Sequence, residues 1–128
     1  MSPRVTGIGG YFFRSRDPQA LARWYSDNLG IDPCPGGDQV WTQAAGPTVW
    51  APFPEDTDYF GARDQASMVN FRVEDLDRML DQLRASGTTI VGDVHTEPIG
   101  RFADVEEDVP PTRLLVSDYE AWLAQDNL

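Results

Sequence analysis

The sequence lacks lysine altogether, and it has only one cysteine and one histidine among 128 residues. Cys34 cannot form a disulfide within the chain, and together with the lone His95 it makes no ligand cluster for a structural zinc. The sequence also has no run of about 20 apolar residues that could span a bilayer, and no apolar signal peptide at its start. We therefore expect a cytoplasmic protein with no membrane partner.

Positive charge is scarce as well, because ten Arg stand against 21 Asp and Glu, which gives a net charge of −11. An acidic protein repels nucleic acid, so a nucleic-acid partner is not expected. The same charge would attract a cationic small ligand, or it could serve only to keep the protein in solution. Hydrophobic residues make up 41% of the chain, with four Trp, four Tyr and six Phe. A chain of this length and composition can bury a core as a single domain.

Two similar segments, Phe13–Asp17 (FRSRD) and Phe71–Asp75 (FRVED), lie 58 residues apart in the chain. Each begins at the end of an apolar stretch, which predicts strands at Ile8–Phe13 and Ser67–Val73. Each ends in an aspartate that directly precedes a helical pattern. The repeat therefore predicts two copies of one strand-helix unit.

Both predicted helices begin at residues with good capping chemistry. Asp17 can cap a helix over Pro18–Leu29, and Gly30 can end it, because glycine adopts the left-handed conformation without strain. Asp75 can cap a second helix over Leu76–Ala85, whose apolar residues recur at helical spacing. We expect the two helices to be equivalent parts of the fold.

Further short strands are expected from β-compatible residues that lie between turn signals. They fall at about 39–43 and 47–51 in the first half, and at about 88–91, 100–105 and 112–116 in the second. A linker rich in Pro, Asp and Gly, at about 54–66, separates the halves. A capping-box pattern predicts a short C-terminal helix at about 117–126.

These elements predict an α+β fold in one domain, residues 1–128, with two tandem βαβββ modules at about 5–53 and 67–116. Three further motifs are Ala22-Arg23-Trp24-Tyr25 before Asn28-Leu29-Gly30, the strand Met68–Val73, and Gly100-Arg101-Phe102-Ala103. With the two helix starts, they resemble the vicinal oxygen chelate superfamily of glyoxalase I, bleomycin-resistance proteins and extradiol dioxygenases. The resemblance covers roughly residues 5 to 107. It implies a curled mixed sheet around a ligand cleft.

Members of this superfamily usually hold a divalent metal with His, Glu or Gln from the first and last strands of each module. The matching positions here are Gly10, Met68, Leu115 and the pair Val49–Trp50. None of them offers a carboxylate, amide or imidazole of the kind that such a metal prefers. We therefore predict neither a bound metal nor another cofactor.

Aromatic side chains on the predicted strands are the candidates for binding a ligand, because strand alternation could direct several into the cleft. The alternative is that they fill the core between sheet and helices. Arg14, Arg72 and Arg101 are charged candidates for the cleft rim or for pairing with acids. The predicted ligand-binding set is Tyr11, Trp41, Trp50, Met68, Arg101 and Phe102.

No catalytic residue is assigned. His95 is the one side chain whose ordinary pKa suits proton transfer near neutral pH, but the sequence identifies no orienting partner beyond the nearby Glu97. Cys34, between two prolines, would need a base to act as a nucleophile, and none is evident. Both residues are more simply explained as surface loop residues.

The hypothesis that these observations favour is a metal-free, small-molecule binding protein of the glyoxalase or bleomycin-resistance type. The alternative is a metal-dependent lyase, isomerase or dioxygenase of the same superfamily, whose ligands lie at other positions. A third hypothesis is a partner-binding protein in which modules pair across a homodimer.

Overall fold

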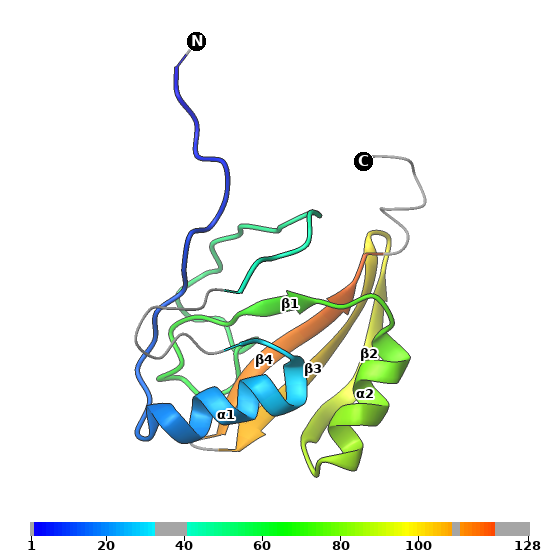
Figure 1. Ribbon diagram of the computed structural model, residues 1–128. Helices are drawn as coiled ribbons and strands as arrows, with labels where there is room; N and C mark the ends of the chain where they lie inside the picture. The colour runs from blue at the N-terminus through cyan, green and yellow to red at the C-terminus, as the bar shows by residue number, and fades with distance from the viewer. Residues whose placement is uncertain (1, 33–40, 109–110, 120–128) are drawn as a thin grey trace.

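The computed structural model describes residues 2–32, 41–108 and 111–119 of the chain. They form an α+β fold of two helices and a four-stranded mixed sheet (Figure 1). In chain order the elements are α1 (Pro18–Leu29), β1 (Asn70–Arg72), α2 (Leu76–Ala85), β2 (Thr89–Glu97), β3 (Gly100–Asp108) and β4 (Pro111–Asp118). Neither helix has the length and hydropathy needed to cross a membrane.

The sheet has the strand order β1-β4-β3-β2, so β1 and β2 are its edges. β1 runs parallel to β4, with Asn70 opposite Leu115, whereas β4, β3 and β2 pair antiparallel. The register of β2 shifts between Val91 and His95, where Gly92 has φ 71°. Glycine suits this position because a positive φ strains residues that carry a Cβ.

Both helices have the predicted bounds, and their ends show the predicted chemistry. The Asp17 carboxylate accepts a hydrogen bond from the backbone N–H of Ala20 at 3.1 Å. The Asp75 carboxylate accepts one from the backbone N–H of Arg78, also at 3.1 Å. Gly30 has φ 70° and ends α1 in the left-handed conformation. The two helix predictions are thus confirmed.

The core lies between α2 and one face of the sheet, here called the helix face. Its fully buried side chains are Leu76, Leu80 and Leu83 of α2 and Ala103, Val105, Leu114 and Val116 of β3 and β4. α1 adds Trp24, Tyr25 and Leu29 to the same cluster. Because successive strand residues point to opposite sides, Phe102, Asp104 and Glu106 lie on the other face. We call it the open face because neither α1 nor α2 covers it (Figure 1).

All four strands come from the second half of the chain, where the four predicted strands are confirmed in shortened or extended form. The segment Ile8–Phe13 and the described residues 41–51 form no strand. A strand depends on hydrogen bonds and packing with a neighbour, and Phe12 is 94% exposed while Trp50 is 84% exposed. The pair of βαβββ modules is therefore not confirmed and stays a prediction.

The predicted C-terminal helix does not begin at 117. Ser117 and Asp118 continue β4, and the Ser117 hydroxyl donates a hydrogen bond to the Asn70 side-chain oxygen at 2.7 Å. This contact with β1 uses the side chain that was expected to cap a helix. Residues 120–126, the rest of the predicted helix, lie outside the described residues.

Candidate functional site

A cavity of about 360 Å³ opens on the helix face, near the beginning of α1 and the paired ends of β3 and β4. This volume is within the range of pockets that hold small organic molecules. Four segments enclose it: the stretch before α1, α1 itself, residues 64–69 and the β3-β4 ends. Its walls are Tyr11, Phe13, Arg14, Leu21, Tyr25, Asp64, Gln65, Ala66, Ser67, Val69, Glu107, Thr112, Arg113 and Leu114.

Three aromatic rings form one side of this cavity. The centroids of Tyr11 and Phe13 lie 5.3 Å apart, and the Phe13 ring meets that of Tyr25 edge-on at 6.0 Å. The Tyr11 hydroxyl lies 3.1 Å from the Ser67 hydroxyl, which joins the first segment to the opposite wall. Tyr25 also meets Phe71 of β1 edge-on at 6.0 Å, so the rings are continuous with the core.

Glu107 is a buried acid in the cavity wall, opposite Thr112 of β4. Its residue is 3% exposed, and the hydroxyls of Tyr25 and Thr112 donate hydrogen bonds to its carboxylate. Its Oε2 atom has no hydrogen-bond partner among the described residues. Burial raises the pKa of the Glu107 carboxyl, and the two hydrogen bonds act in the opposite direction. Burial and the Glu107 charge together raise the pKa of the Tyr25 hydroxyl.

The open face carries a second group of ionisable side chains, which surrounds Asp104. Asp104 is 7% exposed, and its Oδ1 has no hydrogen-bond partner among the described residues. Burial raises the pKa of its carboxyl, while the charges of Arg113 and His95 lower it. Burial, Asp104 and Glu97 raise the pKa of Tyr59. Asp104 is therefore a second acid near His95, besides the Glu97 that the sequence indicated.

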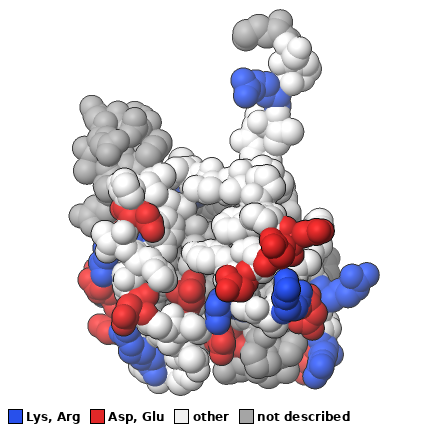
Figure 2. Space-filling model, turned by 180° about the vertical axis from the view of Figure 1, so that it is seen from behind, with Lys and Arg blue, Asp and Glu red and all other residues white. Residues whose placement is uncertain are grey.

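Acidic and basic side chains are interspersed on the side of the molecule seen from behind in Figure 2. Arg113 and Glu106 form an ion pair at 3.9 Å on the open face. In the parts of the chain that the structure describes, no three His, Cys, Asp or Glu residues come close enough together to hold a metal. The positions that the resemblance would assign to metal ligands, among them Met68 and Leu115, carry no carboxylate, amide or imidazole, so these residues do not fit such a metal.

Among the six predicted ligand-binding residues, Tyr11 lines the cavity. Trp41 is 44% exposed and meets Phe71 edge-on at 6.4 Å, near the edge of the sheet. Trp50 is largely exposed, and Met68 is half-buried between two residues that line the cavity without itself lining it. The structure thus does not gather these side chains into one place.

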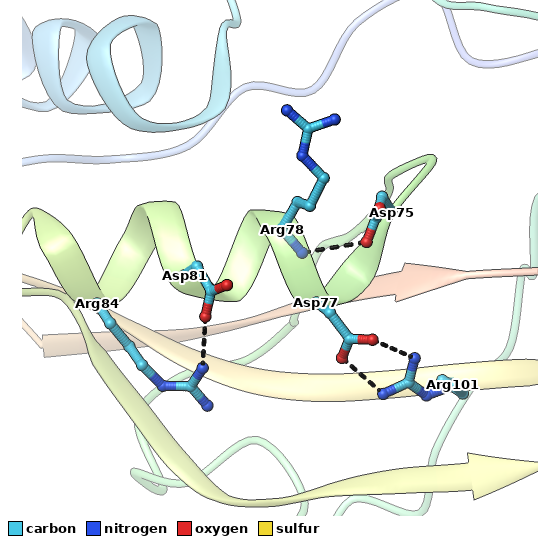
Figure 3. Close-up of polar contacts among 6 residues, drawn as sticks. All are labelled: Asp75, Asp77, Arg78, Asp81, Arg84 and Arg101. Atoms are coloured by element: carbon cyan, nitrogen blue, oxygen red, sulfur yellow. Dashed lines mark hydrogen bonds and ion pairs between the residues drawn. The ribbon is translucent and has the colours of Figure 1, made fainter.

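Arg101 and Phe102 point to opposite sides of the sheet. The Arg101 guanidinium donates two hydrogen bonds to the Asp77 carboxylate of α2, at 2.9 and 3.3 Å (Figure 3). Phe102 lies on the open face, where its ring meets that of Tyr119 edge-on at 5.7 Å. A small ligand on one face of the sheet would therefore not contact both Arg101 and Phe102. Cys34 lies outside the described residues.

Phe13 and three other cavity residues were not predicted from the sequence as parts of a site, namely Tyr25, Glu107 and Thr112. Glu107 was hidden among the many acids of an acidic chain. A signal was nevertheless present, because Ala103, Val105 and Glu107 alternate along one strand, so a strand that buries the first two also turns the acid inward.

No family model and no curated protein matches this chain. Two solved structures resemble it in fold. A virulence protein from Salmonella typhimurium has a TM-score of 0.49 and 14% sequence identity, covering 82% of this chain and 90% of that chain. An integron cassette protein from the mobile metagenome of V. cholerae has a TM-score of 0.45 and 16% identity, covering 82% of this chain and 88% of that chain. Similarity at this level assigns no function.

Proposed function

We propose that this chain is a binding protein for a small organic molecule, which occupies the cavity of about 360 Å³ on the helix face. The cavity itself is the observation that carries the proposal. Ligand pockets are mostly apolar, with a few polar groups that fix the orientation of the ligand. The rings of Tyr11, Phe13 and Tyr25 supply the apolar wall here, and Gln65, Ser67 and Glu107 supply polar groups.

An aromatic or otherwise apolar ligand body suits these walls. Aromatic pairs favour the edge-on contacts that Phe13 and Tyr25 already make, and a planar ligand would add one more ring to the series. Such a body would also displace water from the apolar surface of Leu21, Val69 and Leu114. The proposal needs no metal.

We also propose that the chain has the two-module plan of the glyoxalase and bleomycin-resistance type. The elements β1-α2-β2-β3-β4 follow one another in the order βαβββ, which supports the second of the two proposed modules. Each helix is capped by its own aspartate, Asp17 for α1 and Asp75 for α2, which supports a first module built on the same plan. Together with the motifs of the sequence, these features support a small protein of the glyoxalase and bleomycin-resistance type. Pairing of two chains is a further proposal, which light scattering would test.

The test of binding uses three small aromatic probes of different charge: 2-phenylethylamine, 2-phenylethanol and phenylacetate. Binding to the folded protein raises its melting temperature as the probe concentration exceeds Kd. Ala66 is exposed and lines the cavity, so Ala66→Trp should obstruct it. Ala62, four residues earlier and also exposed, lies outside the cavity wall, so Ala62→Trp is the matched control.

We expect at least one probe to stabilise the wild type and the Ala62→Trp variant. The same probe should have little effect on Ala66→Trp. Equal stabilisation of all three proteins would show that the probe binds elsewhere. The absence of any response to all three probes at high excess would contradict the proposal.

A further inference from the structure

We infer that the cavity selects organic cations, with the buried Glu107 carboxylate as the group that recognises a protonated nitrogen. The inference rests on the proposed binding function and adds the chemical class of the ligand. Its basis is a combination of three observations: Glu107 lines the cavity, its residue is 3% exposed, and its Oε2 has no hydrogen-bond partner among the described residues.

A buried carboxylate oxygen without a partner is costly, because it has lost its water and gained no donor in exchange. The other bonds of Glu107 come from the hydroxyls of Tyr25 and Thr112, which are neutral donors. A ligand with a positively charged N–H group would supply both the missing donor and the opposite charge. An ammonium or amidinium group therefore suits this wall better than a hydroxyl or a carboxylate.

Other charged side chains at the cavity are placed where they act more weakly. Arg14 and Asp64 are exposed, so water and salt screen their charges. Arg113 forms an ion pair with Glu106, which lies on the open face. Glu107 is the deeply buried acid among the cavity residues, and a charge acts more strongly where water is excluded.

The other cavity residues indicate what the uncharged part of the ligand should be. Tyr11, Phe13 and Tyr25 offer ring faces and edges, and a cation is also attracted to the face of a tyrosine ring. A single protonated nitrogen attached to an aromatic or apolar body would therefore match both the acid and the rings. The Tyr25 hydroxyl links the two features, since it belongs to the aromatic wall and bonds to Glu107.

The affinity for such a cation should depend on pH, because only the ionised form of Glu107 attracts it. Burial raises the pKa of this carboxyl, so affinity should increase as the pH rises through that pKa. The other ionisable groups that face the cavity are Tyr11, Arg14, Tyr25, Asp64 and Arg113. A variant that lacks the Glu107 charge separates its effect from theirs.

The decisive experiment compares 2-phenylethylamine with 2-phenylethanol, which has a similar shape and no charge, by isothermal titration calorimetry. In the wild type we expect the amine to bind at least about tenfold more tightly than the alcohol, as a charged hydrogen bond would give. In Glu107→Gln, which keeps the size of the side chain, the ratio should fall to about one. Glu97→Gln removes the charge of an exposed acid that lies outside the cavity wall, and it should keep the preference of the wild type.

The outcomes separate the two proposals. Equal binding of amine and alcohol by the wild type, blocked by Ala66→Trp, would overturn the cation inference and leave the binding function intact. A preference for the amine that persists in Glu107→Gln would also overturn it. If neither probe nor phenylacetate binds, the binding function and this inference fail together.

Discussion

The Gln65 side chain pairs with the backbone of Arg113 in the way a neighbouring strand would. Its Nε2 donates to the Arg113 carbonyl oxygen at 2.7 Å, and its Oε1 accepts from the Arg113 N–H at 2.9 Å. The same Nε2 also donates to the carbonyl oxygen of Ser67 at 3.0 Å. One side chain thus joins β4 to the segment that forms a wall of the cavity, just before β1 begins.

Replacing Gln65 with Ala should destabilise the protein by about 2 kcal/mol, because two backbone groups of Arg113 lose their partner. Urea denaturation gives the free energy of unfolding. Gln19→Ala, at an exposed position of α1, is the control and should stay within about 0.5 kcal/mol of the wild type. A loss as small for Gln65 as for Gln19 would show that water replaces these bonds without cost.

As the pH rises, the free energy of unfolding of Glu107→Gln should increase relative to that of the wild type. Burial raises the pKa of Glu107 in the folded protein above its unfolded value. Between the two values the folded state binds more protons than the unfolded state, so a rising pH lowers the stability of the wild type. Gln does not titrate and escapes this loss.

Urea denaturation from about pH 4 to about pH 8 measures that difference, which should level off above the raised pKa. Glu106 is a half-buried acid on the open face, so Glu106→Gln controls for the removal of one negative charge. A difference that shrinks with rising pH would mean that the hydrogen bonds of Tyr25 and Thr112 outweigh burial.

The buried position of Val116 can be compared with an exposed valine. Val116 is 0% exposed in the centre of the sheet, whereas Val5 is 90% exposed. Val116→Ala should cost about 2 kcal/mol, from lost burial and the cavity that remains. Val5→Ala should change stability by less than about 0.5 kcal/mol. Similar losses for the two variants in urea denaturation would place Val5 in contact with another surface.

The contact between Arg101 and Asp77 should be visible in the titration of Asp77. The hydrogen bonds and charge of Arg101 lower the pKa of this carboxyl, so the contact stabilises the fold above the unfolded pKa and is lost as the pH falls through the folded one. In Arg101→Gln, NMR should show the pKa of Asp77 moving upward. Arg78→Gln is the control, since that guanidinium points away from Asp77 in Figure 3.

Local chemistry sufficed to predict the helices. Asp17, Gly30 and Asp75 each act on backbone groups within a few residues of themselves, so their roles could be derived before any tertiary contact was known. The strands of the second half were predictable for a related reason, since apolar residues between turn signals mark them. The strand at Ile8–Phe13 was not, because a strand forms only where a partner is available.

Tertiary structure decided which side chains share a site. Tyr11, Tyr25 and Glu107 are far apart in the sequence, and their meeting depends on how α1 packs against the sheet. Arg101 and Phe102 are adjacent in sequence yet lie on opposite faces, because α2 covers one side of β3. The hydrogen bonds that cap the helices therefore follow from each segment's own sequence. The cavity exists only after apolar surfaces that are distant in the sequence have packed together.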